Sequence, residues 1–87
     1  MYHINPKILQ TPIADGKALI LEPEKGLYFE LNEVSLVIFQ CLKNNMNIQT
    51  ILEKIVDTFT VSKDQAKSDL MELLEQLTEN NILFITE

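Results

Sequence analysis

The sequence predicts an α+β domain of winged helix-turn-helix-like type, in which a three-stranded antiparallel meander precedes three helices. Two patterns carry this expectation. Short apolar runs separated by turn residues fill the first third of the chain, and apolar residues at helical spacing fill most of the rest. With 87 residues, the chain has room for one hydrophobic core. We therefore expect a single domain over residues 1–87, with residues 1–7 as a loose N-terminal tail.

Three short segments predict the strands, at residues 8–14, 18–21 and 27–31. Pro12 interrupts the first segment, which places it at a sheet edge or makes it irregular, because proline donates no hydrogen bond to a strand ladder. Tight turns join the segments at Asp15-Gly16 and at residues 22–26, and each turn contains a glycine that accepts a positive φ. Two tight turns make the three strands an antiparallel meander.

The third segment has the sequence Leu27-Tyr28-Phe29-Glu30-Leu31. Its alternation predicts Leu27, Phe29 and Leu31 on one face of the strand, with Tyr28 and Glu30 on the other. In a meander the third strand lies at an edge, and this segment has no proline to block a neighbour. Its free N–H and C=O groups are open to an added peptide strand, unless the third helix or residues 82–85 cover them. The sequence alone leaves both interpretations open.

Three amphipathic stretches follow, and each has a residue suited to capping a helix at its start. The expected helices begin after Asn32, Asn47 and Ser62. Ser62 and Gln65 also have the spacing of a capping box, in which each side chain satisfies a backbone amide of the other residue. Residues 82–85, after the third helix, form either a last strand or an apolar tail over the core.

Charge and composition restrict the class of partner. The chain has seven lysines, no arginine and 13 acidic residues, for a net charge of −6. Nucleic acids and anionic membranes attract cationic proteins, so neither is expected as a partner of this acidic chain. A neutral or basic peptide or protein is compatible with its negative electrostatic field. No apolar run approaches the roughly 20 residues that cross a bilayer. The single cysteine, Cys41, is typical of a reducing compartment, and we expect a cytoplasmic protein.

No catalytic or metal-binding set is apparent in the sequence. The one histidine, His3, lies in the expected tail, and Cys41 faces the predicted core, so neither a Cys–His pair nor a zinc site is expected. Acidic residues of the third helix lie opposite its apolar face, where they predict a solvated stripe rather than an acid-base pair: Asp69, Glu72, Glu75 and Glu79. We expect a binding protein that is not an enzyme and needs no cofactor or metal.

Two groups of residues, in their order and spacing, match the pattern of a known family. The first group is Asp15-Gly16, the apolar residues 19–21, and Gly26, Tyr28, Leu31 and Asn32. The second group is Asp69, Leu70, Leu73, Leu74, Leu77 and Asn81-Ile82-Leu83. Over about residues 8–84 the chain resembles the PqqD family, pyrroloquinoline-quinone biosynthesis protein D, and the related precursor-peptide recognition elements. Asn44 and Asn81 stand where that family often has glycine, and asparagine also tolerates a left-handed helix end.

The resemblance implies a peptide chaperone. Members of this family bind the leader of a ribosomally made precursor peptide and present it to a modifying enzyme, which is a radical S-adenosylmethionine protein or, in lasso-peptide pathways, a leader peptidase. The leader adds as a strand beside the third strand and lies in a groove along the third helix. The implied peptide-binding residues are Gly26, Leu27, Tyr28, Phe29, Glu30, Leu31, Ala66, Asp69, Leu70 and Leu73. A plain surface or capping role is equally open for Asp69, and core packing is the main role expected of Leu70 and Leu73.

Two other functions remain open at this stage. A DNA-binding winged-helix regulator would use the third helix for recognition, but residues 63–79 carry two lysines against five acids, which opposes insertion into a phosphate-lined groove. A small accessory subunit would pair with itself through its strand edge, giving a homodimer instead of a monomer.

Overall fold

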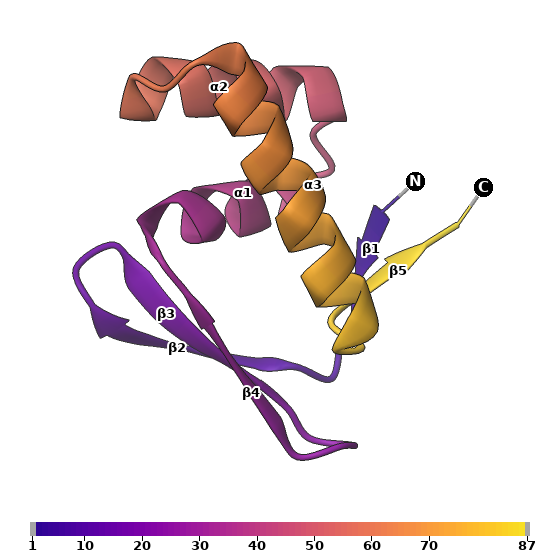
Figure 1. The fold of residues 1–87 in the computed structure, drawn as a ribbon. Helices are drawn as coiled ribbons and strands as arrows, with labels where there is room; N and C mark the ends of the chain where they lie inside the picture. Colours follow the sequence, from indigo (N-terminus) through magenta and orange to yellow (C-terminus); the bar gives the residue numbers. More distant parts are fainter. Residues whose placement is uncertain (1, 87) are drawn as a thin grey trace.

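The computed structural model describes residues 2–86 of the chain. Its elements follow in the order β1 (Tyr2–Ile4), β2 (Leu9–Ala14), β3 (Lys17–Glu22), β4 (Leu27–Leu31), α1 (Glu33–Lys43), α2 (Ile48–Phe59), α3 (Lys63–Glu79) and β5 (Leu83–Ile85). Strands β2, β3 and β4 form a three-stranded antiparallel sheet, and β1 pairs with β5 in a separate two-stranded sheet. Figure 1 shows the helices above and beside the meander, with α3 running from α2 toward β5. The expected α+β fold, a meander followed by three helices, is confirmed.

The meander has β3 at its centre and β2 and β4 at its edges. The pairing of β2 with β3 shifts between Pro12 and Ala14, so the proline lies at an irregular point of an edge strand, where its missing N–H costs least. One face of β3 is buried through Ala18, Ile20 and Glu22, which alternate along the strand. The burial of Glu22 differs from the turn role that the sequence suggested.

Both glycines lie in the turns where the sequence placed them, with positive φ values of 70° at Gly16 and 68° at Gly26. At Gly16 space is restricted as well, because a Cβ atom there would lie 3.0 Å from the Cγ of Glu33. The first turn therefore packs against the first turn of α1, and a side chain at position 16 would strain both the backbone and this contact.

Each helix begins at the predicted cap. The side-chain oxygens of Asn32, Asn47 and Ser62 accept hydrogen bonds from backbone N–H groups three residues later, at 2.9, 2.8 and 3.1 Å. The capping box at α3 is only half formed, because the side chain of Gln65 donates instead to Asp69 Oδ1 at 2.8 Å. One helical turn separates these two residues, so this bond competes with the reach back to Ser62.

Two helices end in asparagine with left-handed backbone, Asn45 after α1 (φ 59°) and Asn81 after α3 (φ 62°). After α3, the N–H groups of Ile82 and Asn81 donate to the carbonyls of Leu77 and Thr78 at 2.9 and 3.3 Å, which is the Schellman pattern of helix termination. After α1 the left-handed residue is Asn45, whereas Asn44 has a φ of −90°.

The expectation of a loose tail over residues 1–7 is wrong for residues 2–4, while residue 1 lies outside the described residues. Strand β1 pairs antiparallel with β5, joining Tyr2 to Ile85 and Ile4 to Leu83. Asn5 follows and is buried, with its backbone N–H donating to the Ile82 carbonyl at 2.8 Å. This pairing is not apparent from the sequence, because neither strand is long enough to show a pattern and the partners lie at opposite ends of the chain. The same pairing identifies residues 83–85 as a strand.

The core lies between the inner face of the meander and the three helices. Its fully buried large side chains include Ile20, Leu31, Phe39, Ile51, Ile55, Leu70, Leu77 and Ile82. Cys41 is buried among them, as its place in the helical pattern predicted. Burial raises the pKa of the Cys41 thiol, and the nearby charge of Lys54 offsets this effect only in part.

Glu22 is a buried carboxylate that joins two distant parts of the fold. Its carboxylate oxygens accept hydrogen bonds from the backbone N–H groups of Glu24 and Lys25 at 3.1 and 2.8 Å, and from Asn81 Nδ2 at 3.4 Å. Burial alone would raise the pKa of Glu22, but these donors, together with the charge of Lys25, outweigh it and hold the pKa below its ordinary value. The ionised carboxylate therefore fastens the β3–β4 turn to the end of α3.

Replacing the carboxylate, in Glu22→Gln, should flatten the dependence of stability on pH in acid. In the wild type the unfolded state binds a proton at Glu22 more readily than the folded state, because the folded pKa is depressed. The stabilisation is complete above the ordinary glutamate pKa of about 4.3 and is lost as pH falls through the depressed folded value. Urea unfolding between pH 2.5 and 7 measures this. Parallel stability curves for the two proteins would contradict the role of Glu22.

Candidate functional site

The outer edge of β4 is open. On one side β4 pairs with β3, and among residues 2–86 no other strand pairs with it. No Cα atom of α3 or β5 comes within 8 Å of a Cα atom of β4, so neither element covers this edge. The sequence left open whether the edge is covered or free, and the described residues leave it free. Backbone N–H and C=O groups along such an edge have no partner within the sheet.

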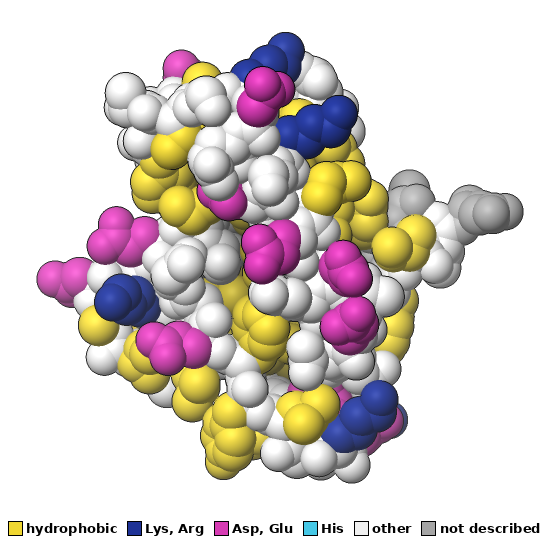
Figure 2. Space-filling model, viewed as in Figure 1, with side chains coloured by type: hydrophobic (Ala, Val, Ile, Leu, Met, Phe, Trp, Pro, Cys, Tyr) yellow, Lys and Arg dark blue, Asp and Glu magenta, His cyan; other side chains and the backbone are white. Residues whose placement is uncertain are grey.

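A hollow of about 320 Å³ lies between the start of α1 and the middle of α3. We call it the β4–α3 groove because Asn32, in its lining, directly follows β4; its other lining residues belong to α1 and α3, and none belongs to β4 itself. Its lining consists of Asn32, Val34, Ser35, Ile38, Asp69, Glu72, Leu73 and Gln76. Figure 2 shows hydrophobic side chains along the bottom of this hollow and acidic side chains along α3 beside it.

The β4 residues named from the sequence alternate as expected. Leu31 is fully buried, and Leu27 and Phe29 are half-buried on the same face. Tyr28 and Glu30 are exposed on the other face, with 69% of the Tyr28 surface accessible to solvent. Gly26 occupies the preceding turn. The strand thus offers its backbone at the edge and the Tyr28 ring on the outer face of the sheet.

The α3 residues named from the sequence divide into two pairs. Asp69 and Leu73 line the β4–α3 groove. Ala66 and Leu70 are fully buried in the core and do not line it, so their places in a peptide-binding wall are not supported by the geometry. Both side chains belong to the buried core cluster.

Six lining residues were missed: Asn32, Val34, Ser35, Ile38, Glu72 and Gln76. A sequence signal was present for the last two, because positions 69, 72, 73 and 76 follow the spacing of one helical face. For the first turn of α1, the sequence indicates a helix start capped by Asn32. Its direct succession to β4 already placed it at the end of the open edge.

The β4–α3 groove is acidic. Asp69 and Glu72 are the charged residues in its lining, and no lysine or histidine lies among them. Asp69 Oδ1 accepts from Gln65 at 2.8 Å, a neutral donor that leaves its charge uncompensated. Among residues 2–86, the ion pair with a nitrogen–oxygen distance within 4.0 Å is Lys7–Glu24. Neither residue lines this groove. The site therefore suits a ligand that brings apolar side chains with neutral or positive polar groups.

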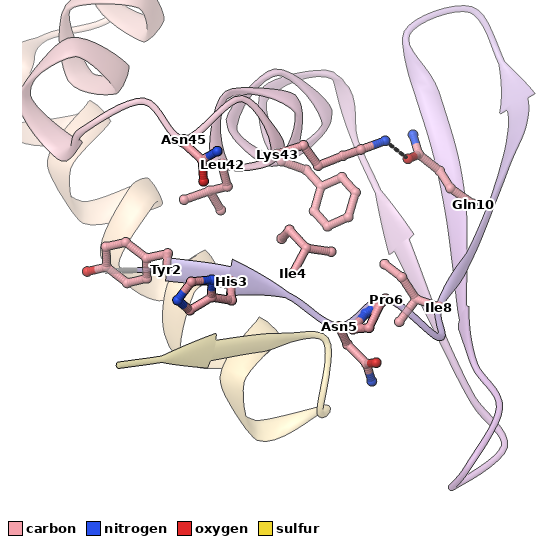
Figure 3. A pocket seen from close by; sticks show the side chains of 11 residues that line it. Tyr2, His3, Ile4, Asn5, Pro6, Ile8, Gln10, Leu42, Lys43 and Asn45 are labelled. Atoms are coloured by element: carbon pink, nitrogen blue, oxygen red, sulfur yellow. Dashed lines mark hydrogen bonds between the residues drawn. The ribbon is translucent and has the colours of Figure 1, made fainter. Parts of the chain in front are cut away.

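Other features of the described chain add no reactive site here. Among residues 2–86 no group of three or more His, Cys, Asp or Glu side chains is arranged to hold a metal ion. No helix in the described part is both long and apolar enough to cross a membrane. A second pocket, of about 410 Å³, lies between β1, β2 and α1 and contains none of the peptide-binding residues named from the sequence (Figure 3).

Comparison with known proteins defines the class. The family model described as coenzyme PQQ synthesis protein D (PqqD) matches residues 17–83, which is most of the chain. The chain therefore belongs to the PqqD family. The match begins at β3 and ends at β5, so it contains both β4 and α3. The comparison with curated proteins found no match.

Two solved structures share the fold. One is TbiB1 in complex with the TbiA(beta) leader peptide, with 23% sequence identity, a TM-score of 0.85, and coverage of 97% of this chain and 96% of that one. The other is lasso peptide synthetase B1 complexed with the leader peptide, with 21% identity, a TM-score of 0.84, and coverage of 97% and 98%. In both comparisons the likeness covers nearly the whole chain and shows a shared fold.

Hydrogen exchange should reveal the open edge in the free protein. Amides of β4 that do not donate to β3 should exchange nearly as fast as those of an unstructured peptide, whereas the amides of β3, paired on both sides, should exchange far more slowly. NMR-detected exchange at neutral pH measures both sets together. Slow exchange at every β4 amide would mean that some element covers the edge.

Proposed function

We propose that this protein binds the leader of a ribosomally synthesised precursor peptide as an added strand on β4 and holds it for a modifying enzyme. The observation that carries the proposal is the open β4 edge beside a groove walled by α3. The protein acts as a binding partner without catalytic residues of its own. The enzyme is a radical S-adenosylmethionine protein or a leader peptidase.

The spacing of the elements supports strand addition. A new antiparallel strand lies about 4.8 Å from its neighbour. No Cα atom of α3 comes within 8 Å of a Cα atom of β4, so the helix backbone does not itself occupy the position of an added strand. Hydrogen bonds from Leu27–Leu31 would fix the register of the peptide, and the pockets beneath its alternate side chains would select its sequence.

Side chains of the groove then meet one face of the bound peptide. Val34, Ile38 and Leu73 offer apolar contact, and Asn32, Ser35 and Gln76 are neutral hydrogen-bonding groups. Asp69 contributes charge at the α3 wall and is a peptide-contacting residue in this proposal. The Tyr28 ring, on the outer face of the sheet, is placed to pack on side chains of the added strand that point away from the groove.

The comparisons support the class of ligand. Both solved structures of this fold are, by their descriptions, complexes with leader peptides. Membership of the PqqD family agrees with a role in building a peptide-derived product. We further propose a cytoplasmic protein with one domain over residues 1–87, acting as a monomer or homodimer. The acidic wall of α3 gives no support to the alternative of a DNA-binding winged helix.

The direct test uses the precursor peptide encoded beside the gene of this protein. Isothermal titration should give micromolar or tighter binding, about 8 kcal/mol or more in free energy. NMR shift changes should map to residues 26–31 and to the groove-lining positions of α3. The β4 amides that exchange quickly in the free protein should become protected. Tight binding that maps elsewhere, or no binding, would contradict the proposal.

A tryptophan placed in the groove tests whether the peptide binds there or elsewhere along α3. Gln76→Trp places a large ring in the lining from an exposed helix position, so we expect peptide affinity to fall about tenfold or more with little change in stability. Met71→Trp is the matched control, because Met71 is 47% exposed on the same helix and does not line the groove. Equal affinities for the two variants would place the peptide outside the groove.

A further inference from the structure

A second groove lies between β1, α1 and the start of α2. It consists of two adjoining hollows of about 410 and 310 Å³, whose linings share Tyr2, Leu42 and Asn45. We call it the β1–α1 groove. The first hollow continues to β2, and the second to Met46 and Ile48. It shares no lining residue with the β4–α3 groove, so the two can be filled at the same time.

The floor of the β1–α1 groove is apolar. Figure 3 shows Ile4 of β1 and Leu42 of α1 pointing into the same space from opposite sides. Met46 and Ile48 are half-buried at the other end. Next to the groove, Ile85 pairs across the two-stranded sheet with Tyr2 and remains 58% exposed. Connected apolar side chains border this hollow, and nothing in residues 2–86 fills it. Such a hollow is typical of an interaction site.

The charge of this groove is opposite to that of the β4–α3 groove. No acidic residue lines it, although the chain has 13 acids. Lys43 stands at its rim, where its Nζ donates to Gln10 Oε1 at 3.2 Å and lies 5.8 Å from the centre of the Phe39 ring (Figure 3). In the described chain no carboxylate lies within 4.0 Å of this ammonium group. A ligand carboxylate would replace the neutral acceptor with a charge-assisted bond.

We propose that the β1–α1 groove docks the modifying enzyme, through a segment that inserts an apolar side chain and sets an aspartate or glutamate against Lys43. This rests on the proposed function, since it assigns a second surface to the enzyme that acts on the bound leader. The complementarity has a definite sign, because Lys43 is the lysine in the lining of this groove and no acidic residue lines it. The enzyme then approaches without competing for β4.

Displayed random peptides of roughly 16 residues test the chemistry of the groove. Peptides selected on the wild type and counter-selected on Lys43→Glu should be enriched in an apolar residue next to an acidic one. A representative peptide should bind Lys43→Glu and Lys43→Gln about tenfold more weakly, with NMR shifts at Tyr2, Leu42 and Ile48. Lys67→Glu, an equal charge change at an exposed position of α3, is the control. The proposal is overturned if the selected peptides show no enrichment in acidic residues. It is also overturned if Lys67→Glu weakens peptide binding as much as Lys43→Glu does.

Reconstitution with the precursor encoded beside the gene and its modifying enzyme separates the two grooves. Lys43→Glu should raise the enzyme concentration needed for half-maximal modification about tenfold, while its affinity for the precursor stays within about twofold of the wild type. Unchanged modification by Lys43→Glu overturns the docking proposal and leaves leader binding intact. Failure of the wild type to bind the precursor refutes the proposed function instead. A dimer that Lys43→Glu dissociates would assign the groove to a second copy and overturn enzyme docking.

Discussion

The corner after α3, where Asn81 adopts left-handed backbone, holds together parts of the chain that lie far apart in sequence. The Asn81 carbonyl accepts a hydrogen bond from Asn5 Nδ2 at 2.8 Å, and its side chain donates to Glu22 at 3.4 Å. The next residue, Ile82, accepts from the backbone of Asn5 and is fully buried. One corner thereby sets the positions of the N-terminal segment, the β3–β4 turn and the C-terminal end of α3.

This arrangement explains how the β4–α3 groove stays open. The end of α3 is tied to the β3–β4 hairpin at Glu22, while Leu70 and Leu77 fix the helix to the core. No comparable contact joins α3 to β4 along the strand itself. The end of α3 is therefore held to the β3–β4 hairpin by the Asn81–Glu22 bond, and the body of the helix is held by its packing in the core.

Local features of the chain were predictable from sequence because their physical cause is local. Helix starts follow from the side chains of Asn32, Asn47 and Ser62, which satisfy amides within one turn, and the turns follow from two glycines. Strand β1 escaped prediction because its pairing with β5 depends on contact between the two ends of the chain. Glu22 escaped because a charged residue beside a proline suggests a solvent-exposed turn, and only the assembled donors around it make burial favourable.

The site was predictable to the level of its elements but not of its side chains. Strand order and the absence of proline marked β4 as an edge strand that is either open or covered, and helical spacing marked one face of α3. On α3, Leu70 packs in the core, as expected of it, and Ala66 is buried as well, whereas the groove lining carries Asp69, Glu72, Leu73 and Gln76. When the apolar stripe of a helix is wide, the sequence does not show which of its residues are fully buried and which lie at the edge of the core.

The pairing of β1 with β5 brings residue 2 opposite residue 85, so the two ends of the described chain lie side by side, away from β4 (Figure 1). A short covalent link between them would close the chain into a ring without moving the meander or α3. A second protein can therefore be fused before β1 or after β5, and in both cases its linker leaves the domain at nearly the same position. Either connection leaves the β4–α3 groove open and places the added protein near the β1–α1 groove.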